Sequence, residues 1–242
     1  MTSLRKAALS ALAAIAFLGA ASTTVEKVGR TRAAIVLPDG TPVASVIIIP
    51  GGTTEQAIDA AGNGSNSANF VMRIRSTFVT AGFAIAYLED PSDLRPIIAR
   101  MRKVARPVFL LSTSNGTSVA ARNAANLGPD GPDGVVLTST VTLSSRKFTE
   151  SAASANVGKI TVPVLFVHNT NDGCSVSPIA GVAPLMGRFA KGADVTRIDV
   201  TSPVTGNDPC EPFSAHGYMG IEDAVAGKIL AWMRAHGAQG AP

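Results

Sequence analysis

Short apolar runs recur along the chain after residue 30, and most are bounded by Gly, Pro, Asn or Asp, which favour turns. Runs rich in Val, Ile and Leu are typical of strands buried on both faces of a sheet. The pattern predicts strands at residues 32–37, 43–50, 83–88, 107–111, 134–138, 162–168 and 195–200. The turn signal Pro38-Asp39-Gly40 separates the first two, which we expect to pair as an antiparallel hairpin.

Between these runs, apolar residues recur at helical spacing or small residues follow one another. The predicted helices cover residues 69–80, 93–104, 116–125, 177–190 and 221–234. Strands that alternate with helices imply crossover connections and a mostly parallel sheet covered on both faces. The predicted fold class is therefore α/β, a three-layer α/β/α sandwich, and no linker or repeat divides it.

The first residues have the layout of a secretory signal peptide. Arg5 and Lys6 precede an apolar run at residues 7–18, and small residues follow at 19–22. The run is shorter than the roughly 20 residues that a helix needs to span a bilayer, so we expect no stable membrane anchor. These features predict export to the periplasm or the medium, with a signal peptide at residues 1–21 and a single domain at residues 22–242.

Composition and charge exclude several classes of protein. Hydrophobic residues make up 46% of the chain and charged residues 16%, which is typical of a domain with a sizeable core. The formal net charge is +4, and the leader supplies two of these charges, so we expect neither nucleic acid nor an anionic membrane as a partner. The two cysteines and three histidines show no ligand spacing, so we expect no metal site and no cofactor.

The two cysteines, Cys174 and Cys210, both lie in the predicted mature chain. In an oxidising compartment an even number of cysteines favours a disulfide, whereas in a cytosolic protein the two thiols would be buried and free. Because the leader predicts export, we expect a disulfide between Cys174 and Cys210.

A serine follows the apolar strand at residues 107–111. The sequence Ser112-Thr113-Ser114-Asn115-Gly116 leads from this strand into a helix of small residues. It resembles the G-x-S-x-G nucleophile elbow of the α/β-hydrolase family, in which a tight turn exposes the serine oxygen above the sheet. Ser112 replaces the first glycine, so the turn must accommodate a hydroxymethyl group there. A Ser114 that only caps the helix is the alternative.

The resemblance extends from about residue 30 to 235 and implies an acid and a base after later strands, in that order. Asp172 follows the strand at residues 162–168, and His216 lies in the loop before the last helix. The family pattern therefore implies a catalytic triad of Ser114, Asp172 and His216, because a serine hydroxyl requires a base and the base an orienting acid.

Each of these residues has a structural alternative. The alternative for Asp172, which precedes a glycine, is that it merely stabilises a turn. The alternative for His216 is that it merely forms a hydrogen bond to the backbone of its loop. Asp90, at the end of an earlier strand, is a second candidate for the acid. We expect His168 to pack at the end of the sheet or to lie behind the site residues. His236 is a second candidate for the base, and we expect it to interact with the carbonyl groups that end the last helix.

The resemblance also implies an oxyanion hole made of two backbone N–H groups. One belongs to Asn115, directly after the nucleophile, and the other to Gly52 or Thr53 in the glycine-containing loop after residues 43–50. Many members of the family carry a helical cap in the interval that is occupied here by residues 141–159 only. We therefore expect a minimal cap and an open cleft.

Together these residues predict a serine hydrolase that cleaves carboxylic esters through an acyl-enzyme. The same machinery would serve an amide, peptide or thioester hydrolase, and a non-catalytic binding protein on the same scaffold is the third alternative. The expected partner is a small-molecule or polymer-borne acyl substrate. A disulfide between Cys174 and Cys210 would tie the loop of the acid to the loop of the base and hold their geometry.

Overall fold

The computed structural model describes residues 21–146, 149–204 and 206–238. The predicted signal peptide, apart from Ala21, lies outside these residues. Within them, no helix has the length and apolar character needed to cross a membrane.

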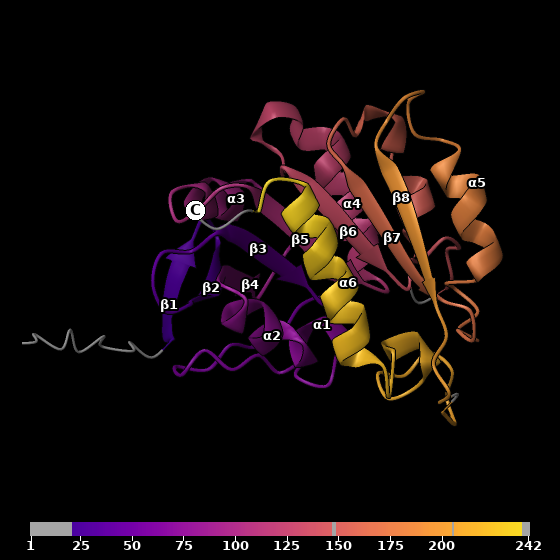
Figure 1. Cartoon of the computed structure of the whole chain (residues 1–242), viewed down its shortest axis with the longest axis horizontal. Coiled ribbons are helices and arrows are strands. Elements are labelled where there is room, and N and C mark those ends of the chain that lie inside the picture. The colour runs from indigo at the N-terminus through magenta and orange to yellow at the C-terminus, as the bar shows by residue number, and fades with distance from the viewer. Residues whose placement is uncertain (1–20, 147–148, 205, 239–242) are drawn as a thin grey trace, which may run out of the picture.

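An eight-stranded sheet forms the centre of the protein, with the strand order β1-β2-β4-β3-β5-β6-β7-β8 (Figure 1). The pairs β1–β2 and β2–β4 are antiparallel, and all pairs from β4 to β8 are parallel. The mostly parallel sheet predicted from the sequence is therefore confirmed. The strands are β1 (Ser22–Val28), β2 (Thr31–Leu37), β3 (Ala44–Ile49), β4 (Phe83–Leu88), β5 (Val108–Thr113), β6 (Gly134–Thr138), β7 (Val164–Asn169) and β8 (Val195–Val200).

Helices cover both faces of this sheet and complete the three layers (Figure 1). Phe78 of α2 and Ile229 of α6 belong to the core on one face. Ile98 of α3, Val119 of α4 and Leu185 of α5 belong to the core on the other. The three-layer α/β/α prediction is confirmed. The helices are α1 (Phe70–Arg73), α2 (Arg75–Thr80), α3 (Arg95–Arg102), α4 (Gly116–Leu127), α5 (Val182–Met186) and α6 (Glu222–Ala235).

The predicted hairpin between residues 32–37 and 43–50 is wrong. β2 pairs with β1 and β4, and β4 lies between β2 and β3. Every residue of β3 and of β4 is buried, so both strands take central places, whereas the polar strand β1 takes the edge. The hairpin that does form joins β1 to β2 through Gly29, whose φ of +63° suits a tight turn.

Two predicted helices are shorter than expected. The helix over residues 69–80 is divided at Ile74 into α1 and α2. The helix over residues 177–190 is reduced to a 3₁₀ turn at Ile179–Gly181 followed by α5. Pro184 explains the second difference, because proline has no N–H to donate and is tolerated only in the first turn of a helix.

The carboxyl ends of the parallel strands lie at one edge of the sheet, which is where ligands collect in open α/β folds. Four of the loops that leave this edge carry predicted site residues. Gly52 follows β3, Ser114 follows β5, Asp172 follows β7 and His216 follows β8. The topology thus gathers residues that are far apart in the sequence.

Candidate active site

Ser114 lies in a sharp turn between β5 and α4. Its φ of +50° is in the left-handed region, which is rare for residues other than glycine, and its amide donates to the Thr138 carbonyl at 3.0 Å. The turn depends on Gly116, where a Cβ atom would lie 2.4 Å from the carbonyl oxygen of Ile49. Glycine at position 116 therefore lets α4 start directly against β3, with the serine at the end of the sheet.

Ser112 occupies the position where the nucleophile elbow usually has glycine. Its side chain is fully buried, and its Oγ atom donates to the Val136 carbonyl on β6 at 2.9 Å. The hydroxyl of Thr138 in turn donates to the Ser112 carbonyl at 2.9 Å. Because both hydroxyls have backbone partners, the fold accepts Ser112 without burying an unsatisfied polar group.

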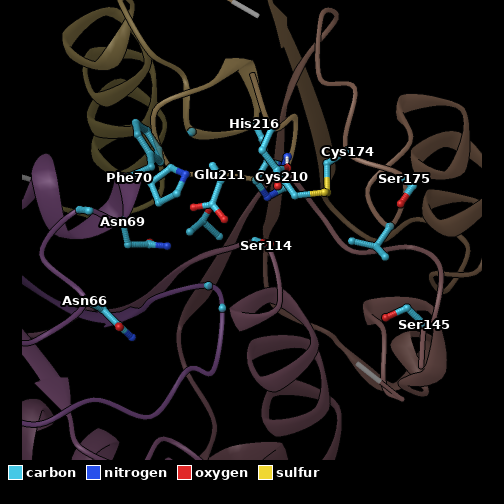
Figure 2. A pocket seen from close by; sticks show the side chains of 18 of the residues that line it. Asn66, Asn69, Phe70, Ser114, Ser145, Cys174, Ser175, Cys210, Glu211 and His216 are labelled. Atoms are coloured by element: carbon cyan, nitrogen blue, oxygen red, sulfur yellow. Dashed lines mark hydrogen bonds between the residues drawn. A yellow bond between two sulfur atoms is a disulfide. The ribbon is translucent and has the colours of Figure 1, made fainter. Parts of the chain in front are cut away.

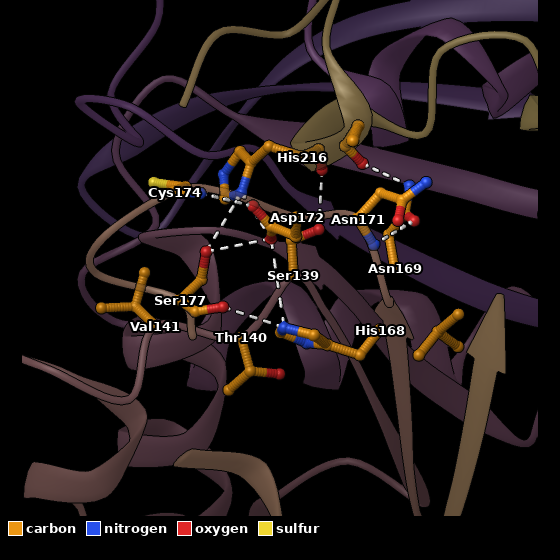
Figure 3. Close-up of polar contacts among 12 residues, drawn as sticks. Ser139, Thr140, Val141, His168, Asn169, Asn171, Asp172, Cys174, Ser177 and His216 are labelled. Atoms are coloured by element: carbon orange, nitrogen blue, oxygen red, sulfur yellow. Dashed lines mark hydrogen bonds and ion pairs between the residues drawn. The ribbon is translucent and has the colours of Figure 1, made fainter. Parts of the chain in front are cut away.

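Asp172 and His216 form a hydrogen-bonded pair in the loops after β7 and β8 (Figure 3). Nδ1 of His216 lies 2.9 Å from Oδ2 of Asp172, and the Cys174 amide donates to Oδ1 at 2.9 Å. The Asp172 side chain is fully buried, and His216 is 4% exposed. A carboxylate only accepts hydrogen bonds, so the pairing places a proton on Nδ1 and leaves Nε2 as the atom that can accept one.

The loop that carries His216 is held from two sides. On the sheet side, Oγ of Ser139 donates to the His216 carbonyl at 2.6 Å. On the other side, the guanidinium of Arg73 in α1 donates to the carbonyls of Pro212, at 3.1 Å, and Gly217, at 2.7 Å. These contacts fix the backbone on both sides of the imidazole.

Ser114 and His216 line the same pocket, whose volume is about 530 Å³ (Figure 2). Among the described residues, the buried Nε2 atom of His216 has no hydrogen-bond partner, so no hydrogen bond joins it to Ser114. The structure therefore brings the predicted acid and base into contact and places the predicted nucleophile in the pocket that His216 also lines. Catalytic hydrogen bonds of this kind often tighten only in the complex with substrate.

Most of the other side chains in this pocket are polar. Phe70 and Val176 supply apolar wall, and among the described residues the formal charges that line the pocket are those of Asp208 and Glu211, with no Lys or Arg. This charge favours neutral or cationic groups over anionic ones. The polar lining also includes Ser65, Asn66, Asn69, Ser145 and Ser175.

The predicted oxyanion donors lie on two adjoining loops. Asn115 and Gly52 are in contact, because the Asn115 side-chain amide donates to the Gly52 carbonyl at 2.9 Å. Gly52 lines the Ser114 pocket, whereas Asn115 and Thr53 do not, and Thr53 lines a separate, wider cavity instead. Within the described part of the chain, the backbone amides of Asn115 and Gly52 donate to no protein group. Of the two predicted second donors, Gly52 has the better position.

A disulfide joins Cys174 to Cys210, as expected from the sequence. The two Cα atoms are 4.6 Å apart, and the residues are separated by 36 positions. Both cysteines line the pocket (Figure 2). The bridge therefore ties the loop of Asp172 to the loop of His216 at the wall of the pocket.

No protein-family model and no curated protein sequence matches this chain. Solved structures do match: the Est1E protein from Butyrivibrio proteoclasticus superimposes with a TM-score of 0.59 at 14% identity, over 91% of this chain and 100% of the other. The esterase domain of a Rhodothermus marinus protein superimposes with a TM-score of 0.59 at 16% identity, over 89% of this chain and 98% of the other. XC6422 from Xanthomonas campestris, described as an a/b serine hydrolase without lid, superimposes with a TM-score of 0.54 at 15% identity. The match covers 88% of this chain and 94% of the other. This chain has the α/β-hydrolase fold.

The α/β-hydrolase fold has little cap here. Between β6 and β7, the described residues form only two 3₁₀ turns, at Ala152–Ser154 and Val157–Lys159. Ala152 and Val157 belong to the core on the face of the sheet that α3, α4 and α5 cover. These turns therefore pack on the domain rather than over the site. The pocket is therefore reached without displacing a helical cap.

The alternative acid and base lie away from this pocket. Asp90 is exposed, and its Oδ1 atom accepts a hydrogen bond from the Ser92 amide at 2.8 Å. Nδ1 of His236 lies 2.7 Å from the Trp232 carbonyl, and its Nε2 lies 3.1 Å from Asp194. Neither residue lines the pocket that holds Ser114. Within the α/β-hydrolase fold, Asp172 and His216 thus have the better geometry.

Sequence reasoning missed Ser177 and expected His168 to pack at the end of the sheet or to lie behind the site residues. Both side chains are fully buried beside Asp172. Burial lowers the pKa of His168 below its ordinary value, and the Asp172 carboxylate, 4.0 Å from Nε2, offsets part of that shift. The His168 ring is therefore neutral at neutral pH. Ser177 is the first residue of the predicted helix at residues 177–190, which proved shorter, so no periodicity marked it as buried.

The structure offers no metal site among the residues it describes. No group of three or more His, Cys, Asp or Glu side chains in that part of the chain could hold an ion. Both cysteine thiols are consumed by the disulfide.

Proposed function

We propose that this protein is a serine hydrolase that cleaves carboxylic esters, with Ser114 as nucleophile, His216 as general base and acid, and Asp172 as the acid that orients His216. The observation that carries the proposal is the unpartnered Nε2 atom of His216. It is buried at the wall of the pocket that Ser114 also lines, while Nδ1 is held by Asp172. An imidazole oriented in this way beside a strained serine is the arrangement that acyl transfer requires.

The reaction takes place in two halves. Oγ of Ser114 attacks the ester carbonyl carbon while Nε2 of His216 takes its proton, and the tetrahedral intermediate collapses as the C–O bond to the alcohol breaks. His216 returns the proton to the departing alkoxide, which leaves as the alcohol. Water then attacks the acyl-serine with His216 again as base, and the acid and free Ser114 are regenerated.

Two backbone amides are proposed to stabilise the negative oxygen of the intermediate. The Asn115 amide stands at the start of α4, where the helix dipole adds to its donor strength. The second donor is the amide of Gly52, whose loop is bound to Asn115. Both amides are without protein acceptors among the described residues, so they are available to a substrate.

The substrate is proposed to be a small or polymer-borne ester without a negative charge close to the acyl group. The low cap supports access for a bulky alcohol or polymer, and the carboxylates of Asp208 and Glu211 at the pocket disfavour anions. Export to the periplasm or the medium is supported by the predicted leader and by the disulfide, which is typical of oxidising compartments.

The test is hydrolysis of p-nitrophenyl acetate, butyrate and octanoate by the full chain produced under oxidising conditions. We expect turnover by the parent and a loss of kcat of at least about 10³-fold for Ser114→Ala, with an unchanged melting temperature. Ser118→Ala, four positions further along in the first turn of α4, is the matched control and should keep its kcat. Turnover by Ser114→Ala at the parental rate would overturn the assignment of the nucleophile.

A folded parent that hydrolyses none of these esters would overturn the ester assignment. The same panel should then be repeated with p-nitroanilides and acyl thioesters, whose leaving groups the same residues would serve. Activity on either would keep the roles of Ser114, Asp172 and His216. Inactivity on all three classes would favour a binding protein.

A further inference from the structure

The Asp172 carboxylate has a second side-chain donor besides His216. Oγ of Ser177 donates to Oδ2 of Asp172 at 3.0 Å and also lies 3.1 Å from Nδ1 of His216 (Figure 3). Ser177 is fully buried, and its side chain does not line the pocket. The hydroxyl therefore sits at the junction of the acid and the base, out of reach of a substrate.

The protons at this junction can be assigned from donor and acceptor chemistry. The carboxylate accepts only, so Asp172 takes one hydrogen bond from the Ser177 hydroxyl and one from Nδ1–H of His216. The Ser177 Oγ atom can then also accept a hydrogen bond from Nδ1–H of His216, because the two atoms are 3.1 Å apart. The opposite arrangement, with Ser177 donating to a bare Nδ1, would put the imidazole proton on Nε2, where it would block uptake of the Ser114 proton.

His168 holds Ser177 in this position from behind. Nε2 of His168 lies 2.9 Å from the Ser177 carbonyl, and His168 is fully buried at the end of β7. A carbonyl accepts only, so the neutral ring carries its proton on Nε2. Nδ1 of His168 has no partner among the described residues, so Ser177 is the residue that this buried ring binds.

We propose that Ser177, anchored through its backbone by His168, is a positioning residue that keeps the proton of His216 on Nδ1 and so leaves Nε2 bare toward Ser114. The inference rests on the proposed function. It adds a fourth group to Ser114, Asp172 and His216, a hydroxyl that neither touches the substrate nor transfers a proton to it. The role is exercised entirely through Asp172 and His216.

The kinetic test compares Ser177→Ala with Ser45→Ala on a p-nitrophenyl ester. Ser45 is the matched control, because it is also fully buried and its hydroxyl also bonds in the interior, to the Met101 and Ala105 carbonyls, away from the pocket. We expect kcat to fall about tenfold for Ser177→Ala with KM within about twofold, and to stay within about twofold for Ser45→Ala. Ser177→Thr keeps an Oγ atom and should recover most of the loss.

The structural test is independent of any substrate. The chain has three histidines, so ¹⁵N spectra of histidine-labelled protein contain few ring signals. At about pH 9, the parent and Ser45→Ala should show the proton of the His216 ring on Nδ1 alone. Ser177→Ala should show both tautomers in exchange. A Ser177→Ala protein that keeps the single Nδ1–H tautomer would overturn the proposal, whatever its activity.

The spectra also separate this proposal from the ester assignment. If the parent hydrolyses no ester, the proposed function fails, while the tautomer of His216 still decides the role of Ser177. The part of His168 is tested by a double-mutant cycle with His168→Phe, which removes the donor to the Ser177 carbonyl. The double variant should lose no more kcat than Ser177→Ala alone, and additive losses would show that His168 does not act through Ser177.

Discussion

The carboxylate of Asp172 meets Nδ1 of His216 at 2.9 Å, although the two residues are 44 positions apart in the sequence. Its second oxygen is bound by the Cys174 amide. Both oxygens therefore have protein donors, and rotation of the carboxylate would break a bond on each side. This buried carboxylate therefore holds Nδ1 of the imidazole in place.

Asp172→Asn should inactivate the protein without unfolding it. The amide has nearly the same shape, but its NH₂ group is a donor and favours the His216 tautomer with the proton on Nε2. We expect kcat to fall by about 10³- to 10⁴-fold, measured with a p-nitrophenyl ester at saturation. Asp90→Asn, at an exposed strand end, is the control and should retain parental activity. If Asp90→Asn lost activity and Asp172→Asn kept it, the acid would have been assigned to the wrong residue.

Loss of the disulfide should affect stability and catalysis together. Replacing Cys174 and Cys210 by serine opens a link between positions 36 residues apart, which costs about 4 kcal/mol of the free energy of unfolding in the chain-entropy description. Because the bridge ties the acid loop to the base loop, kcat should fall as well. Urea unfolding and ester hydrolysis of the parent, with and without reductant, provide the comparison. Unchanged values of both would contradict the role given to the bridge.

Gly116→Ala should destabilise the protein by about 1 to 3 kcal/mol, because the new methyl group would overlap the Ile49 carbonyl oxygen. Gly227 in α6 is the matched control: it is exposed, and a Cβ atom there would meet nothing within 4 Å. Gly227→Ala should stabilise α6 by about 0.5 to 1 kcal/mol. Urea titrations measure both changes, and destabilisation by both substitutions would refute the steric argument for position 116.

The stability of the protein should decrease as the pH falls below about 6.5, the ordinary histidine pKa. Burial lowers the pKa of His168 in the folded state, so below about 6.5 the unfolded chain takes up a proton that the folded chain refuses. The free energy of unfolding therefore drops as pH decreases from about 6.5 toward the lower folded pKa. His168→Gln does not titrate and should show a smaller decrease between about pH 7.5 and 5.5. Identical slopes for the two proteins would contradict the shift.

The central part of the fold was predictable because its signals are local. Fully buried strands such as β7 are continuous apolar runs, and in a parallel sheet the residues that follow such strands gather at one edge. The order of the serine, acid and base positions came instead from the resemblance to the α/β-hydrolase family. β1 was missed because its sequence, STTVEKV, is largely polar and sits at the sheet edge. The order of β2, β3 and β4 depends on pairing across the sheet, which no local pattern records.

Ser177 illustrates what remained outside the reach of sequence reasoning. Its importance comes from contacts with residues 5 and 39 positions away, and from a His168 ring that reaches its carbonyl. The substitution of Ser112 for glycine was likewise unexplained until the Val136 carbonyl was seen to accept its hydroxyl. Both depend on the meeting of separate segments, which only the folded chain provides.

The hydrogen bonds from the Arg73 guanidinium to the loop of His216 can form only late in the synthesis of the chain. Arg73 leaves the ribosome long before Pro212 and Gly217, the two carbonyl groups that it holds. Until those residues have been synthesised, these two hydrogen bonds of Arg73 cannot form, and Ser114 has no proposed base beside it. A chain that ends before His216 would therefore contain the proposed nucleophile, Ser114, without its proposed base, and we expect it to be inactive. Activity would be the last property that the growing polypeptide acquires.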